Sequence, residues 1–129
     1  MTKRLVCVSL FLIAAAWTAG ADQIFRMGTA EGEILRYAQR CSYQVSFDGM
    51  VDSPRYGELD YHSSVDAFVG TMSGLTMTVY RSAQAVHMGE PAAEKQSLKT
   101  YIIEGATSRG VRMDYKGYDS ATVFCWYMK

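Results

Sequence analysis

The segment QRCSYQVSFDG, residues 39–49, alternates polar and apolar side chains. A period of two is typical of a β-strand with one buried face. The apolar side holds Cys41, Tyr43, Val45 and Phe47. A second segment, ATVFCWYMK (121–129), ends the chain and is apolar on both faces, which is typical of a central or well-covered strand. A cysteine lies on the apolar side of each segment.

The first 21 residues have the organisation of a secretory signal peptide. Lys3 and Arg4 precede an apolar run, residues 5–17, and Ala19-Gly20-Ala21 offers small residues for cleavage. The run is too short to span a bilayer core of about 30 Å. We therefore expect residues 1–21 to be removed, leaving a single β-rich extracytoplasmic domain over 22–129 with no membrane span. Such a protein would be periplasmic or secreted, and a chain without asparagine, with more arginine than lysine, suits a bacterial origin.

Export also determines what the cysteines can do. Cys7 would leave with the signal peptide, so Cys41 and Cys125 would be the only cysteines of the mature protein. Two cysteines in an oxidising compartment usually pair. A bridge between them would close a loop of about 85 residues and stabilise the fold by about 4 to 5 kcal/mol. We predict a Cys41–Cys125 disulfide that joins an early strand to the last one.

Further short strands are predicted between glycine residues. LTMTVY (75–80) is rich in β-branched and aromatic residues, and SLKTYIIEG (97–105) and GVRMDYKG (110–117) alternate in character. YGELDYH (56–62) is a candidate sixth strand. Short turns join antiparallel neighbours and leave no room for helical crossovers. The expected fold is mainly β, a small antiparallel sandwich or barrel, with α+β as the alternative.

Three segments have features of a helix. TAEGEILRYAQRC (29–41) has apolar residues at helical spacing and Thr29 as an N-cap, and we expect a short N-terminal helix that runs into a strand near Arg40. SSVDAFVGTM (63–72) also fits a helix face, although Gly70 and its β-branched residues count against one. GEPAAEKQ (89–96) is expected to form one or two exposed turns within the longest connection, residues 82–97.

The net charge of the chain argues against some classes of binding partner. The chain has 13 basic and 13 acidic residues. Removal of Lys3 and Arg4 leaves 11 basic residues against the same 13 acidic ones, because the signal segment contains no Asp or Glu. Nucleic acids and anionic membranes bind to concentrated basic surfaces. We therefore expect a protein partner and no nucleic acid.

The densest polar cluster is ELDYHSSVD (58–66). On one continuous strand, Glu58, Asp60 and His62 would share a face, where their oxygen and nitrogen atoms could hold a divalent metal or perform general acid–base chemistry. Charged alternate residues are equally typical of a solvated strand face. The spacing matches no established metal motif, so these residues define the alternative function rather than the main one.

Aromatic and basic residues are interleaved in the last third of the chain. On an exposed face they could form a binding platform, because tyrosine, tryptophan and arginine dominate protein-binding surfaces, although a small chain also needs aromatics in its core. In DYKGYD (114–119), a tight turn at Lys116-Gly117 should expose Tyr118. The expected partner-binding residues are Arg112, Tyr115, Lys116 and Tyr118 from this region and His87, Met88 and Glu90 from the predicted loop.

A hydrolase needs a nucleophile with a base or a pair of acids, and only Glu58, Asp60 and His62 come near that requirement. We expect a small exported, non-enzymatic binding protein that recognises another protein in the cell envelope or outside the cell, as an inhibitor or immunity protein does. We predict no catalytic residues and no cofactor. The alternative is a metal-binding protein or metal-assisted enzyme that uses Glu58, Asp60 and His62.

Overall fold

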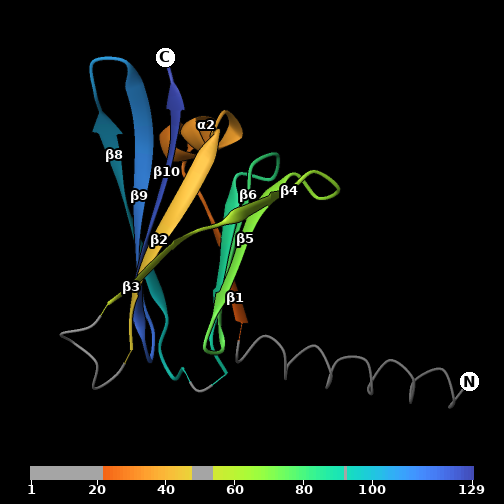
Figure 1. Ribbon diagram of the computed structural model, residues 1–129, viewed down its shortest axis with the longest axis vertical. Helices are drawn as coiled ribbons and strands as arrows, with labels where there is room; N and C mark the ends of the chain where they lie inside the picture. The colour runs from red at the N-terminus through yellow and green to blue at the C-terminus, as the bar shows by residue number, and fades with distance from the viewer. Residues whose placement is uncertain (1–21, 48–53, 92) are drawn as a thin grey trace, which may run out of the picture.

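The computed structural model describes residues 22–47, 54–91 and 93–129, so the predicted signal peptide lies outside the described residues. These residues form two five-stranded antiparallel sheets that face each other, with one helix at one end (Figure 1). Sheet A has the order β1 (Asp22–Arg26), β7 (Ala85–Gly89), β6 (Leu75–Tyr80), β5 (Ala67–Met72), β4 (Asp60–His62). Sheet B has the order β3 (Arg55–Glu58), β2 (Arg40–Ser46), β10 (Ser120–Met128), β9 (Ser108–Lys116), β8 (Ser97–Glu104).

The predicted mainly β fold is confirmed, and it is a sandwich of two sheets. The five strands expected from alternation and composition are β2, β6, β8, β9 and β10, each within three residues of its predicted bounds. The C-terminal segment is the central strand of sheet B, as its apolar character indicated. Its outer face is open to solvent, however, because Phe124 is exposed while Ala121, Val123 and Cys125 are buried.

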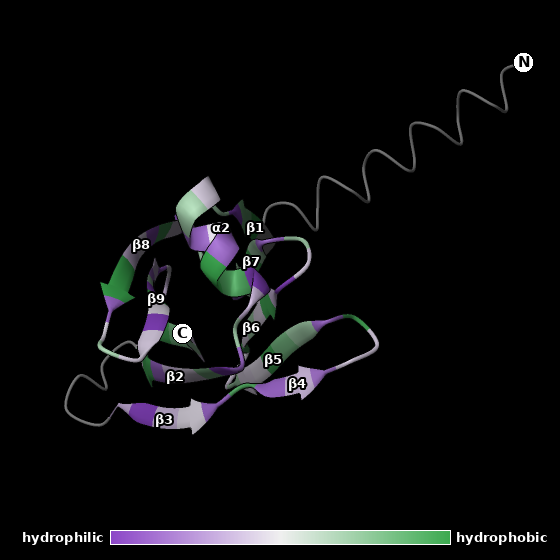
Figure 2. Cartoon of the chain, turned by 90° about the horizontal axis from the view of Figure 1, so that it is seen from above, coloured by the Kyte–Doolittle hydropathy of each residue, from purple (hydrophilic) through white to green (hydrophobic). Residues whose placement is uncertain are grey.

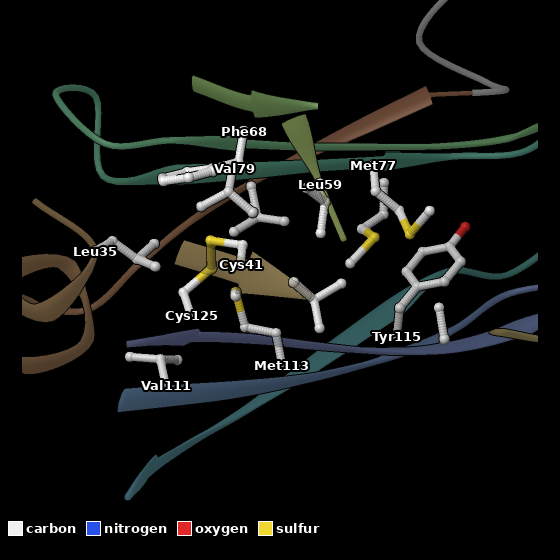
Figure 3. Close-up of a cluster of buried hydrophobic side chains, with 14 of the residues drawn as sticks. Leu35, Cys41, Leu59, Phe68, Met77, Val79, Val111, Met113, Tyr115 and Cys125 are labelled. Atoms are coloured by element: carbon white, nitrogen blue, oxygen red, sulfur yellow. A yellow bond between two sulfur atoms is a disulfide. The ribbon is translucent and has the colours of Figure 1, made fainter. Parts of the chain in front are cut away.

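The predicted disulfide is also present. Cys41 of β2 lies directly opposite Cys125 of β10, and their α-carbons are 4.2 Å apart. Both residues are fully buried between the sheets. Figure 3 shows the two sulfur atoms in the middle of the core, between Leu35 of the helix and the apolar side chains of both sheets. The bond therefore fixes the central ladder of sheet B at the centre of the molecule.

Helix α2 (Thr29–Arg36) covers one end of the core. Ile34 and Leu35 are buried, as is Ala38 just beyond the helix, and the chain then enters β2 at Arg40, as predicted. The N-cap is Gly28 rather than Thr29, which is the first helical residue, and no side chain caps the helix. Arg36 in the last turn suits the negative end of the helix dipole.

The helical reading of residues 63–72 is wrong. Residues 63–66 form a turn, and β5 follows with β4 on one side and β6 on the other. Pairing on both edges satisfies the strand's backbone, and Gly70 and the β-branched residues suit a strand better than a helix. The described part of residues 89–96 contains no helix either, although the Ala93 N–H donates to the Glu90 carbonyl at 3.3 Å and closes one turn.

The loop expected over residues 82–97 is interrupted by a buried strand. β7 pairs with β6 and with the N-terminal strand β1, which the sequence did not predict. Val86 and Met88 are fully buried, so Met88 is a core residue and not part of a surface loop. His87 is half-buried and points away from these two residues, since neighbours on a strand face opposite sides.

Glu90 was predicted to bind a partner from a surface loop. It is instead buried, with 4% of its surface exposed. Both carboxylate oxygens accept the backbone N–H of Asp119, at 2.8 and 3.0 Å. Asp119 lies in the turn between β9 and β10, so Glu90 connects the end of sheet A to sheet B. Gly117 in the same turn has no room for a side chain, because a β-carbon there would collide with the Glu90 carboxylate. Burial raises the pKa of Glu90, and the nearby Asp119 carboxylate adds to the effect.

Removing the disulfide should destabilise the protein strongly. The bond joins residues 84 positions apart, and a loop of that length gives about 4 to 5 kcal/mol in the chain-entropy model. The variant C41A/C125A should lose about that much free energy of unfolding in urea titration, with no change in the far-UV spectrum at zero urea. A loss below about 1 kcal/mol would contradict the chain-entropy account.

Replacing Glu90 should change the free energy of unfolding by an amount that depends on pH. Because the folded state raises the Glu90 pKa, this group's contribution to stability is largest below its unfolded-state pKa and is lost as the pH rises through the folded-state value. The advantage of the wild type over E90Q in free energy of unfolding should therefore grow as the pH falls from neutral to about 4. E90A, which leaves the Asp119 N–H without its acceptor, should cost about 1 to 3 kcal/mol. A difference between wild type and E90Q that does not vary with pH would contradict the raised pKa.

Candidate functional site

The outer face of sheet B gathers side chains from four strands into rows. Alternate residues of β2, β10, β9 and β8 align across the sheet, while the residues between them form the core. The rows are Ser46, Ser120, Lys116, Ser97; then Gln44, Thr122, Asp114, Lys99; then Ser42, Phe124, Arg112, Tyr101; and finally Arg40, Trp126, Gly110, Ile103. The first two rows are entirely polar, and the last two carry the aromatic side chains.

The polar half of this face is hollowed. Its two rows line a depression of about 370 Å³, with Tyr115 and Ala121 completing the lining. The Tyr115 side chain itself points into the core (Figure 3). Serine and threonine occupy four of the eight outward positions, and short side chains leave space between the longer lysine and glutamine side chains. We call this depression the polar hollow.

The carboxylate in the polar hollow already has partners. Asp114 accepts hydrogen bonds from Arg112 Nη2 and Thr122 Oγ1, each at 3.1 Å. Lys99 and Lys116 form no ion pair with any residue in the described ranges. Among the described residues that line the hollow, Asp114 is the one acid, so it does not neutralise the charge of both ammonium groups.

The aromatic half of the face lies toward helix α2 and the C-terminus. Tyr101 and Ile103 are each 42% exposed and Phe124 is 37% exposed. The Arg112 guanidinium lies 4.3 Å from the centroid of the Tyr101 ring, which is within range of a cation–π interaction. Figure 2 shows a hydrophobic segment at the end of β8, on the outside of the sandwich. Apolar side chains that gather in one exposed patch, rather than singly, are typical of an interaction surface.

A second aromatic–arginine pair lies across the same half of the face. The Arg40 guanidinium is 5.3 Å from the centroid of the Trp126 ring and also pairs with Glu58 on β3. Gly110 lies beside Trp126 in the row, and a β-carbon there would come within 3.2 Å of the Trp126 β-carbon. The same β-carbon would come within 2.9 Å of the Cys125 carbonyl oxygen, so position 110 has no room for a side chain.

The structure brings together only some of the predicted partner-binding residues. Arg112 and Lys116 lie on the outer face of sheet B, and Tyr118 is 59% exposed in the turn at its end. Tyr115 is a core residue, because it falls on the opposite side of β9. Met88 and Glu90 are buried and His87 lies on β7 in the other sheet, so none of the three is part of this face.

Glu58, Asp60 and His62 do not share a strand face. The segment divides at Leu59, so Glu58 ends β3 in sheet B while Asp60 and His62 belong to β4 in sheet A. Leu59 is buried, and its N–H donates to the Cys41 carbonyl at 2.9 Å. Nowhere in the described part of the chain do three His, Cys, Asp or Glu side chains group closely enough to hold a metal ion. The expectation of one common face is therefore wrong.

The residues of the polar hollow that the sequence did not single out come from several strands. Sequence reasoning named Arg112 and Lys116 but not Lys99, Gln44 or Thr122, which come from three different strands. Their alternation within each segment was visible in the sequence. Their alignment into one row was not, because that depends on the strand order.

A second polar cluster joins two turns of sheet A to the helix. Asp66 accepts hydrogen bonds from Arg81 Nε at 2.8 Å, from Tyr61 at 2.6 Å and from Ser82. Arg81 Nη1 also donates to the Ala38 carbonyl just after α2, at 2.8 Å. The Ser82 hydrogen bond, followed by those from Tyr61 and Arg81, lowers the pKa of Asp66 to about 2. So weak a base is poorly suited to proton abstraction at neutral pH, and the contacts give the cluster a structural role.

Stability should fall in acid as this cluster loses its charge. The pKa of Asp66 is lowered in the folded state, so its contribution is present above the unfolded value near 3.8 and is lost as the pH falls toward about 2. D66N should melt at a lower temperature than the wild type at neutral pH, and the difference should shrink as the pH falls from about 4 to about 2. A melting-temperature difference that stays constant over this range would contradict the lowered pKa.

Within the described residues, no helix has the length and apolar character needed to span a membrane. Comparison with known proteins gave no family assignment: no protein-family model matches the chain, and neither the curated proteins nor the solved structures contain a significant match. The function is therefore argued from the two halves of the sheet B face.

Proposed function

We propose that this protein is a non-enzymatic binding protein, exported to the periplasm or secreted, that recognises another protein of the bacterial envelope through the outer face of sheet B. An inhibitor or an immunity protein acts in this way. The observation that carries the proposal is the aromatic half of this face, where Tyr101, Ile103 and Phe124 are exposed beside Arg112. Tyrosine, tryptophan and arginine are the residues that most often dominate protein-binding energies.

The scaffold also supports this function. A sheet whose central ladder is cross-linked has a fixed backbone, so binding through its outer face requires little ordering of the backbone. The disulfide is compatible with an oxidising compartment. The face also pairs apolar rings with a polar region beside them, which is the usual composition of a protein interface.

Affinity capture from an envelope extract of the source bacterium, followed by mass spectrometry, tests the proposal. The wild type should retain one protein in stoichiometric amount, and Y101S/F124S should bind it at least about tenfold more weakly. V65S is the matched control, because Val65 is 57% exposed but lies on the β4–β5 turn of the other sheet. Unchanged melting temperatures would show that both variants are folded.

The same purified protein can be used to test the alternative, a metal site at Glu58, Asp60 and His62, against the proposed function. D60A/H62A should capture the partner as well as the wild type does, and elemental analysis of the purified protein should give no stoichiometric metal. Retention of the partner by Y101S/F124S, or a bound metal lost in H62A, would overturn the proposed function.

A further inference from the structure

The polar hollow has a composition that indicates what it binds. Its outward side chains are lysine, glutamine, serine and threonine, together with Asp114. Every one of these except Asp114 can donate a hydrogen bond, and the Asp114 carboxylate is already occupied by Arg112 and Thr122. A cavity of about 370 Å³ is large enough for one or two side chains of a partner. The hollow thus offers donors and positive charge to whatever enters it.

Lys99 and Lys116 are close enough for both ammonium groups to contact one anionic group of a ligand. Lys99 of β8 is opposite Asp114 of β9, and Lys116 is the next residue of β9 on the same face. Diagonal neighbours of this kind have β-carbons about 7 Å apart. Lysine side chains are long and flexible, so both ammonium groups can reach a single anion between them. Because neither forms an ion pair within the described residues, no internal salt bridge has to break first.

We infer that the polar hollow binds an acidic side chain, Asp or Glu, of the protein partner, with Lys99 and Lys116 contacting its carboxylate. The inference rests on the proposed function and extends it to the chemistry of the partner. Charge complementarity selects the carboxylate, and the adjoining Tyr101 and Phe124 select an apolar residue beside it in the partner. An acidic sugar fits less well, because Tyr115, the one aromatic residue among the described residues that line the hollow, has its ring in the core.

A pair of capped peptides tests this inference without the natural partner. The ¹⁵N-labelled protein is titrated with acetyl-Phe-Gly-Glu-amide and with acetyl-Phe-Gly-Gln-amide, which differ in one charge. The Glu peptide should bind about tenfold more tightly at low salt, with amide shifts centred on residues 97–99, 114–116 and 120–122. The preference should weaken at high salt, as expected for attraction between partly exposed charges.

Variants of the two lysines identify the source of the preference. K99M/K116M should bind both peptides equally, and K99E/K116E should prefer acetyl-Phe-Gly-Lys-amide. K95M is the matched control, because Lys95 is exposed between β7 and β8 and does not line the hollow. It should retain the wild-type preference.

Three results would overturn the inference: equal binding of the Glu and Gln peptides by the wild type, shifts centred away from the hollow, or tighter binding of glucuronate than of the Glu peptide. These results are separable from a failure of the proposed function. If Y101S/F124S loses the captured partner but the peptides show no charge preference, only the acidic-side-chain inference fails. If capture does not depend on the aromatic half, the proposed function itself fails.

Discussion

The pairing of β2 with β10, held by the Cys41–Cys125 disulfide, is the constraint on which the rest of the structure depends. The two cysteines lie directly opposite each other, so the bond fixes the register of the central ladder as well as its position. A slip of one residue would turn every inward side chain of the strand outward. Ala121, Val123 and Cys125 face the core only in this register, and Thr122, Phe124 and Trp126 consequently face solvent. The same bond thereby supports the core and the candidate binding face.

One crossing of the chain and two side-chain contacts join sheet A to sheet B and to the helix around this centre. Along one edge the chain itself passes from β3 to β4 at the buried Leu59. At one end Arg81 connects the turns of sheet A to the helix, and at the other Glu90 connects the end of β7 to the β9–β10 turn. The remaining edge is more open, with a hollow of about 320 Å³ lined by residues of β1, β8 and the start of the helix. The two sheets are therefore connected at both ends of the sandwich and along one of its edges.

The outer face of sheet B differs from an ordinary solvated sheet surface in how its residues are distributed. The aromatic side chains Tyr101, Phe124 and Trp126 all lie in one half, beside Arg40 and Arg112, and the other half is entirely polar. The change from polar to aromatic occurs at the same level on β8 and β10, while β9 between them carries charged residues at that level. Lys99 and Tyr101 on β8 match Asp114 and Arg112 on β9 and Thr122 and Phe124 on β10. The result is a surface that combines charge with apolar area, as protein interfaces do.

The sequence by itself determined five of the strands, the short helix and the covalent link. Alternation identified β2, β8 and β9, the apolar C-terminal segment identified a central strand, and two cysteines in apolar rows identified the disulfide, because each of these signals lies within a single short segment. Only the tertiary structure decided which segments were buried by pairing. Residues 85–90 appeared as a surface loop until β1 and β6 enclosed them, and Glu58, Asp60 and His62 appeared as one face until the chain crossed between sheets at Leu59. The polar hollow belongs to the same category, since its residues come from four strands and are adjacent only through the register of three ladders.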